Sequence, residues 1–298
     1  MSTLRELKTR IGSVSSSEKI TGAMKMISSA KVHKNEQALR QLVPFRSQIR
    51  SIMAHLLSAD ANYSSPLIEP REVQHIGVVV FGSDDGLCGA YNINIFKYLL
   101  RRIREIRDQY QPLVRISVIP VGRKIQHACE KLDIDGVDVM LIDGIDSKIE
   151  GDEVNSFTLR LQQDYLSASL DLVEVVYMSF KSMSRQVLSH EQLFPVTEEA
   201  LVSAGRGETQ AEENRLYIFE PDPNRIFNEV LPMFVLSTMQ EISIENRASE
   251  QAARVMAMQS ANDNAKKLLD ELRLEYNKLR QQSITTELLD ILGGQVER

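Results

Sequence analysis

"ASEQAARVMAMQSANDNAKKLLDELRLEYNKLRQQSITTELLDI", residues 248–291, contains neither glycine nor proline, and its apolar residues recur every three or four positions. This spacing predicts one long helix, because side chains three and four residues apart share a helix face. From Met233 to about Leu292 the helix would be on the order of 90 Å long at 1.5 Å per residue. Charged and amide residues interrupt its apolar stripe, so it is too polar for burial inside a compact domain. Such a helix needs a partner helix.

The N-terminal segment supplies that partner. Between Leu4 and about Leu57 the apolar residues again follow a helical stripe, at first with the alternating spacing of a coiled-coil seam. The stripe nearly vanishes between residues 28 and 37 and then resumes. We therefore expect a long helix that packs at both ends, packs less in its middle, and bends near Pro44.

The start of the C-terminal helix has its own signals. "PDPN" (221–224) contains aspartate and asparagine, which cap helices by accepting hydrogen bonds from the first free amides. Pro232 lies eight residues further on and is expected to kink or restart the helix.

Between the two helices the apolar pattern changes. "HIGVVVFGS" (75–83) is a continuous apolar run, which is typical of a strand buried on both faces. Further strands are expected at 114–122, 136–143 and 215–221 and in a hairpin of 170–180 with 185–196, and helices at 92–110, 123–132 and 152–168. This alternation predicts an α/β domain with a mostly parallel, Rossmann-like sheet and an antiparallel edge. We divide the chain into an N-terminal coiled-coil helix (1–58), the α/β domain (59–223) and a C-terminal coiled-coil helix (224–298).

The charge is distributed unevenly along the chain. The net charge is −6, but residues 1–58 carry +7, residues 59–223 carry −11 and residues 224–298 carry −2. A basic arm on an acidic protein indicates either a solvated helix face or an acidic partner. Nucleic acid is a poor match for that partner, because the arm has a single aromatic residue, Phe45, and no nucleic-acid-binding motif.

Composition excludes several classes of protein. No apolar run is long enough to span a membrane, and the N-terminus lacks the apolar core of a secretory signal. Two cysteines, Cys88 and Cys129, allow one disulfide at most, which fits a reducing compartment.

The segment that most resembles an active site is "GSDDGLCGAYN" (82–92), a glycine-rich turn after the first buried strand. Its glycines match neither the P-loop pattern GxxxxGKS/T nor GxGxxG, so we expect a structural turn and no nucleotide site. The five histidines have no metal-ligand spacing, and the aspartates of 133–146 lack the calcium-loop pattern. We assign no catalytic, cofactor-binding or metal-binding residue.

Three helical blocks and the central turn together resemble the gamma subunit of F-type ATP synthase. The blocks are "EKITGAMKMISSAKVHK" (18–34), "ASEQAARVMAMQSANDNA" (248–265) and "YNKLRQQSITTELLDILGG" (276–294), and the turn is "SDDGLCGAYN". The resemblance implies an antiparallel coiled coil that rotates as the central shaft inside a ring of alpha and beta subunits. It implies an α/β foot on the membrane ring of c subunits, where the epsilon subunit also binds, and a rotor that couples ion flow to ATP synthesis or hydrolysis without catalysing either.

The resemblance also implies contact residues. Met24 and Lys25 align with the neck that faces the beta subunits, whose acidic lever loop would match the basic arm. Further beta contacts are implied at Arg280, Gln281, Thr285 and Glu287, and c-ring contacts at Tyr217 and Glu220. Residues 282–292 would form a single-helix tip in an apolar sleeve of the ring.

The sequence departs from the family pattern at two points, and two other hypotheses of function stay open. Asp85 stands where the family often has a basic or polar residue, and the chloroplast cysteine insertion is absent. With no presequence before Met1, we expect a bacterial form, peripheral to the plasma membrane on its cytoplasmic side. Two rival hypotheses are a nucleotide-binding α/β enzyme with coiled-coil arms and a self-associating coiled-coil tether.

Overall fold

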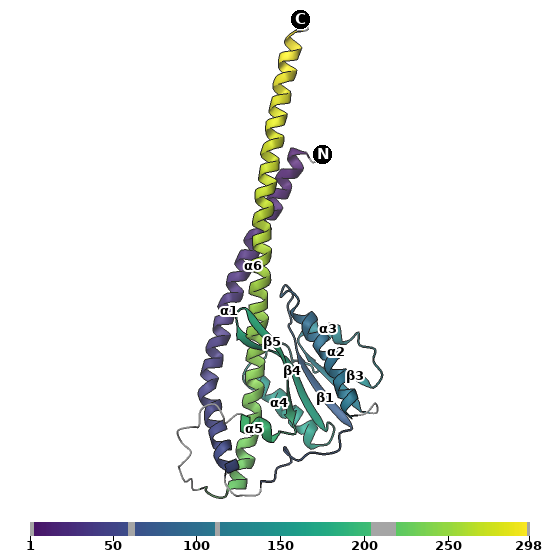
Figure 1. The fold of residues 1–298 in the computed structure, drawn as a ribbon, viewed down its shortest axis with the longest axis vertical. Helices are drawn as coiled ribbons and strands as arrows, with labels where there is room; N and C mark the ends of the chain where they lie inside the picture. Colours follow the sequence, from purple (N-terminus) through teal and green to yellow (C-terminus); the bar gives the residue numbers. More distant parts are fainter. Residues whose placement is uncertain (1–2, 59–62, 111–113, 204–218, 297–298) are drawn as a thin grey trace. The chain divides into compact units, whose positions relative to one another are not determined.

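The computed structural model describes residues 3–58, 63–110, 114–203 and 219–296 (Figure 1). The chain forms two compact units: Lys31–Ala253, and Met1–Ala30 with Arg254–Arg298. Two long helices, α1 (Leu4–Ser58) and α6 (Pro223–Val296), each contribute to both units. The sequence-based boundaries follow the ends of these helices, whereas the contacts group residues 31–58 and 223–253 with the sheet.

The unit Lys31–Ala253 is built on a five-stranded sheet in the order β3-β2-β1-β4-β5. Its strands are β1 (His75–Phe81), β2 (Arg115–Val121), β3 (Val137–Val139), β4 (Leu172–Ser182) and β5 (Arg185–Phe194). All neighbouring strands are parallel except β4 and β5, which form an antiparallel hairpin. The expected mostly parallel sheet with an antiparallel edge is confirmed. The strand expected at 215–221 lies largely outside the described residues, and its described part, 219–221, is not a strand.

Helices cover both faces of this sheet (Figure 1). On one face lie α2 (Tyr91–Tyr110) and α3 (Arg123–Cys129). On the other face lie α4 (Asp152–Leu166), the short α5 (Glu198–Ser203), the end of α1 and the first part of α6, as far as Ile242. The central strands read as continuous apolar runs because alternate side chains enter two separate cores.

The order of the strands defines a switch point between β1 and β4. From β1 the chain moves outward through β2 to β3, and α4 then returns it to the opposite side of β1. At such a point the carboxyl ends of the two strands lead away in different directions, and open α/β sheets bind their ligands in the crevice between them.

Helix α6 begins at the PDPN segment, where the sequence indicated, and it continues through Pro232 without a restart. Asp222 caps it, with Oδ1 accepting a hydrogen bond from the amide of Arg225 at 2.9 Å. Apolar side chains on either side of Pro232, namely Phe227, Leu231, Phe234 and Val235, are buried against the sheet. Burying four such side chains contributes about 6–12 kcal/mol, which exceeds the roughly 3 kcal/mol that an internal proline costs. Helix α1 likewise continues through Pro44.

In the unit Lys31–Ala253 the two helices run antiparallel. Arg46 of α1 forms an ion pair with Glu241, whereas Lys34, earlier in α1, lies near Glu250, later in α6. The expected loss of packing between residues 28 and 37 is wrong here, since Val32 and Asn35 are both buried. The apolar stripe disappears from the sequence because the seam continues through polar side chains.

The unit Met1–Ala30 with Arg254–Arg298 is a helix pair. Asn262 of α6 donates from Nδ2 to the carbonyl of Glu18 at 2.6 Å and to Oγ1 of Thr21 at 3.3 Å. Leu7 is buried on the N-terminal side of that contact, and Leu269 and Leu272 are buried on the C-terminal side of Asn262. The helices are therefore antiparallel, as the family resemblance implied.

Candidate functional site

The neck residues lie on α1 in the helix pair. Met24 and Lys25 are half-buried, while the adjacent Met26 and Ile27 are 68% and 58% exposed. Two large apolar side chains open to solvent beside a lysine form a surface suited to a partner that is both apolar and acidic.

The C-terminal part of α6 presents the other predicted beta contacts. Arg280, Gln281, Thr285 and Glu287 are all exposed. Thr285 bonds along its own helix, from Oγ1 to the carbonyl of Gln281 at 2.9 Å. The structure thus leaves these polar groups available on the helix surface.

Apolar residues are exposed along the same part of α6. Among the side chains that the structure describes, none beyond Leu272 is buried. Ile284, Leu288, Leu289 and Ile291 are between 45% and 63% exposed. A helix with an exposed apolar face needs a partner to cover that face.

Of the two predicted foot residues, only one can be placed. Tyr217 lies outside the described residues, and Glu220 is exposed just before the start of α6. The structure therefore brings Glu220 to the surface without grouping it with a second contact residue.

The glycine-rich turn after β1 is filled by its own side chains. Oδ1 of Asp84 accepts a hydrogen bond from the amide of Arg123 at 3.0 Å, and the Asp84 side chain is fully buried. Asn92 accepts from the amide of Ser83 at 3.1 Å and donates to its hydroxyl at 2.8 Å. Gly122 packs so closely on this turn that a Cβ there would lie 3.1 Å from the Ser83 backbone. The turn is a tightly packed connection between β1 and α2, and its local polar groups serve to hold it together.

Asn246 of α6 occupies the switch point between β1 and β4. Its side chain is completely buried, its Nδ2 donates to the Gly82 carbonyl at 3.1 Å, and its Oδ1 accepts from the Tyr91 hydroxyl at 2.7 Å. The crevice that would hold a ligand in a nucleotide-binding sheet is therefore taken up by a helix of the same chain.

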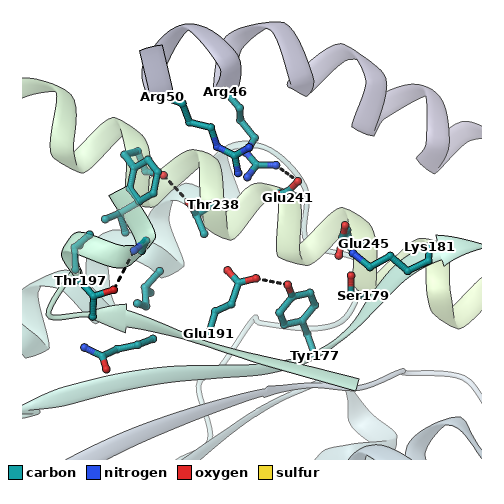
Figure 2. A pocket seen from close by; sticks show the side chains of 16 residues that line it. Arg46, Arg50, Tyr177, Ser179, Lys181, Glu191, Thr197, Thr238, Glu241 and Glu245 are labelled. Carbon is teal, nitrogen blue, oxygen red and sulfur yellow. Dashed lines mark hydrogen bonds and ion pairs between the residues drawn. The ribbon is translucent and has the colours of Figure 1, made fainter. Parts of the chain in front are cut away.

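An ionic pocket of about 450 Å³ lies among α1, α6 and the β4–β5 hairpin, and Figure 2 shows its side chains converging from these elements. Arg46 pairs with Glu241, and the Tyr177 hydroxyl donates to Glu191 at 2.5 Å. Burial, together with the neighbouring Arg50, lowers the pKa of Arg46 to about 10. Burial, followed by the charge of Glu191, raises the pKa of Tyr177.

The charges around this pocket balance. Three cations (Arg46, Arg50, Lys181) face three carboxylates (Glu191, Glu241, Glu245). A balanced lining favours neither an anionic nor a cationic ligand, so the pocket is best understood as an ionic contact between the helices and the hairpin.

Sequence reasoning missed Asn246 and the ionic pocket. The available signal was the run of small or polar residues Ser243, Asn246, Ser249 and Glu250, which has helical spacing and is buried throughout. Polar residues at buried helix positions indicate specific hydrogen-bonded neighbours. Within the described ranges no cluster of His, Cys, Asp or Glu could hold a metal ion, and no helix is apolar enough over sufficient length to cross a membrane.

A helix pair with exposed apolar and polar side chains, in a chain whose sheet has its ligand crevice filled, is typical of a subunit that works through contacts with other subunits. Residues 3–296 match the family model described as ATP synthase. The ATP synthase gamma chain of Bacteroides thetaiotaomicron is 38% identical, with all of both chains covered. That of Heliobacterium modesticaldum is 33% identical, with 98% of this chain and 97% of the relative covered. The chain belongs to the gamma-chain family, the central-stalk subunits of F-type ATP synthase.

Solved structures agree on the fold. A chain of the Euglena gracilis mitochondrial ATP synthase, from a structure of its OSCP, F1 and c-ring, aligns with a TM-score of 0.62. The identity is 22%, and the alignment covers 98% of this chain and 93% of that one. A chain of the rotor from the same organism aligns with a TM-score of 0.59 at 21% identity, covering 94% and 98%.

Proposed function

We propose that this chain is a non-catalytic rotor shaft, which couples ion flow through a ring of c subunits to conformational change in catalytic beta subunits. The observation that carries the proposal is the C-terminal part of α6, where apolar and polar contact residues are exposed and no described side chain beyond Leu272 is buried. Such a helix suits a ring of subunits that encloses it and against which it turns.

Six residues are proposed to contact the beta subunits. Met24 and Lys25 would meet them at the neck, where the basic arm favours an acidic loop through long-range attraction. Arg280, Gln281, Thr285 and Glu287 would form polar contacts further along α6. Their exposure supports this role, because a rotating surface needs groups that bond transiently with successive partners.

The domain of residues 59–223 is proposed as the foot, which would carry the epsilon subunit and stand on the c ring through Tyr217 and Glu220. The chain would then be peripheral to the bacterial plasma membrane, on its cytoplasmic side, and would take part in hydrogen ion transport only through the complex. Its identity to bacterial gamma chains supports this location.

The absence of catalysis is proposed from two observations. Asn246 fills the switch point between β1 and β4, and the turn at 82–92 uses its polar groups for bonds within the turn and to the amide of Arg123, and so does not offer them to a phosphate. Equilibrium dialysis of the purified chain with ATP and Mg²⁺ should show no stoichiometric binding. Binding that is lost in the Asn246→Leu or Gly86→Ala variant would favour the rival nucleotide-binding enzyme.

Reconstitution with tagged alpha and beta subunits tests the rotor directly. The chain should co-purify with them, and the complex with c ring in vesicles should pump protons as it hydrolyses ATP. Met24→Lys should lower the protons pumped per ATP while leaving assembly intact, since an added charge at the neck changes contacts worth about 1 kcal/mol. Failure of the wild-type chain to join alpha and beta subunits would refute the proposal.

A further inference from the structure

Helix α6 crosses from one face of the sheet to the other within the unit Lys31–Ala253. Met239 and Ile242 pack in the core that contains α4, whereas Ala253 packs against the core that contains α2. Between these residues the helix passes the carboxyl ends of the strands, where backbone N–H and C=O groups no longer have a hydrogen-bond partner on the neighbouring strand. Asn246 lies at this crossing.

The Asn246 amide continues the hydrogen bonding between β1 and β4 after the strands stop pairing. The last paired residues are Val80 and Val176. Two positions further along the chain lie Gly82, just beyond the end of β1, and Met178, still within β4. The carbonyl of Gly82 accepts from Nδ2 of Asn246 at 3.1 Å, and the amide of Met178 donates to its Oδ1 at 3.3 Å. One side-chain amide thus bridges two neighbouring strands as a peptide group would.

Helix α2 is fixed by the same amide. The Tyr91 hydroxyl, at the first residue of α2, donates to Oδ1 of Asn246 at 2.7 Å and lies 3.1 Å from its backbone carbonyl. Asn246 therefore connects α6 to β1, β4 and α2 at one buried point, and both ends of its amide are satisfied.

These bonds supply what the surrounding apolar contacts cannot. Apolar packing is non-directional, so on its own it allows a helix to slide or rotate slightly against a sheet. Hydrogen bonds to fixed backbone groups depend on distance and angle and resist both movements. We infer that Asn246 is the positioning residue that locks α6 to the sheet and so transmits torque between them, an inference that rests on the proposed rotor function.

The test uses the complete ATP synthase reconstituted in vesicles with variants of this chain. Asn246→Leu keeps the approximate volume and removes every side-chain hydrogen bond. Tyr91→Phe keeps the buried ring and removes only the hydroxyl. Asn264→Ala, an exposed position on the same helix, is the matched control. The measurements are ATP hydrolysis, protons pumped per ATP, and the melting temperature of each purified chain.

We expect Asn246→Leu to lower the protons pumped per ATP to less than half of the wild-type value while hydrolysis continues. Tyr91→Phe should lower the ratio by a smaller fraction, and Asn264→Ala should leave it unchanged. A melting temperature that falls in both variants with an unchanged pumping ratio would show a purely structural role and overturn the inference. If Asn246→Leu prevents assembly, the protons pumped per ATP by the Tyr91→Phe complex test the inference: a lowered ratio supports it, and an unchanged ratio overturns it.

The two proposals fail in distinguishable ways. A wild-type complex without coupled pumping would contradict the rotor function itself. A wild-type complex that pumps normally, together with variants that pump equally well, would contradict only the role of Asn246.

Discussion

Deleting the residues after Ser283 should weaken assembly without weakening the chain itself. The deleted part of α6 includes Ile284, Leu288, Leu289 and Ile291, and each is about half exposed in the free chain. None of the described side chains in this part is buried, so the free chain loses no core contact. Its melting temperature should therefore stay within about 1 °C of the full-length value, since surface changes shift stability by roughly 0.5 kcal/mol or less.

The loss in the complex follows from the same exposures. Complete burial of an aliphatic side chain contributes about 1.5–3 kcal/mol, so covering the exposed half of four contributes about 3–6 kcal/mol. The lower value corresponds to roughly hundredfold weaker association. Titration of the truncated chain into a ring of alpha and beta subunits, followed by gel filtration, measures this difference.

A polar replacement separates apolar contact from helix length. The triple variant Ile284→Ser, Leu288→Ser, Ile291→Ser keeps the helix and should weaken association nearly as much as the deletion. Thr286→Ala, exposed on the same part of the helix, serves as the control. Equal association of the full-length and truncated chains, or a large fall in the melting temperature of the free truncated chain, would refute the reasoning.

Three further predictions concern the stability of the free chain. Arg102 donates hydrogen bonds to the buried carboxylate of Glu174 at 2.7 and 2.8 Å, and Arg102→Ala leaves that carboxylate without this partner. The substitution should lower the free energy of unfolding, measured with urea, by about 3–5 kcal/mol, whereas Arg101→Ala at an exposed position should lower it by less than about 1 kcal/mol. Gly122→Ala should destabilise by about 1–3 kcal/mol, because φ is +110° and the Ser83 backbone is close, while Gly12→Ala, with open space inside α1, should stabilise by about 0.5–1 kcal/mol. Burial raises the pKa of Cys129 from 9.0 to about 12, so the contribution of its neutral thiol to the free energy of unfolding is complete below pH 9 and is lost as pH rises toward 12. Between pH 8 and 10 the free energy of unfolding of the wild type should therefore fall by about 1.4 kcal/mol more than that of Cys129→Ala. Parallel pH dependences of the two proteins would contradict this.

Local periodicity was sufficient to predict most elements of the fold, but it missed the short α5, and it predicted a strand at 215–221 whose described part is not a strand. The continuous apolar runs of β1, β2 and β4 are visible in the sequence because these strands are buried on both faces, and the helical stripe of α2 is visible because one face of that helix is buried. The long terminal helices were equally clear. One expectation for them failed locally: Pro232 was expected to kink or restart α6, and the helix does not restart there, because buried neighbours on both sides keep it continuous.

Contacts between distant residues could not be predicted in this way. Asn246 and Gly82 are 164 positions apart, and a hydrogen bond from a side chain to a backbone carbonyl leaves no periodic signal. The seam through Val32 and Asn35 was missed for a related reason, since a buried asparagine looks like a gap in an apolar stripe. The contact residues taken from the family resemblance stay predictions, apart from the exposure that the structure gives Arg280, Gln281, Thr285, Glu287 and Glu220.

The two edges of the sheet bear on how the chain behaves before it finds its partners. Strand β3 is only three residues long, so that edge exposes little backbone to which another chain could add a strand. The longer edge strand β5 carries exposed Arg185, His190 and Glu191, and the β4–β5 pairing is irregular near Phe180 and Ser182. Charge and irregularity both discourage edge-to-edge pairing. Pairing between the sheets of two subunits that have not yet assembled is therefore disfavoured.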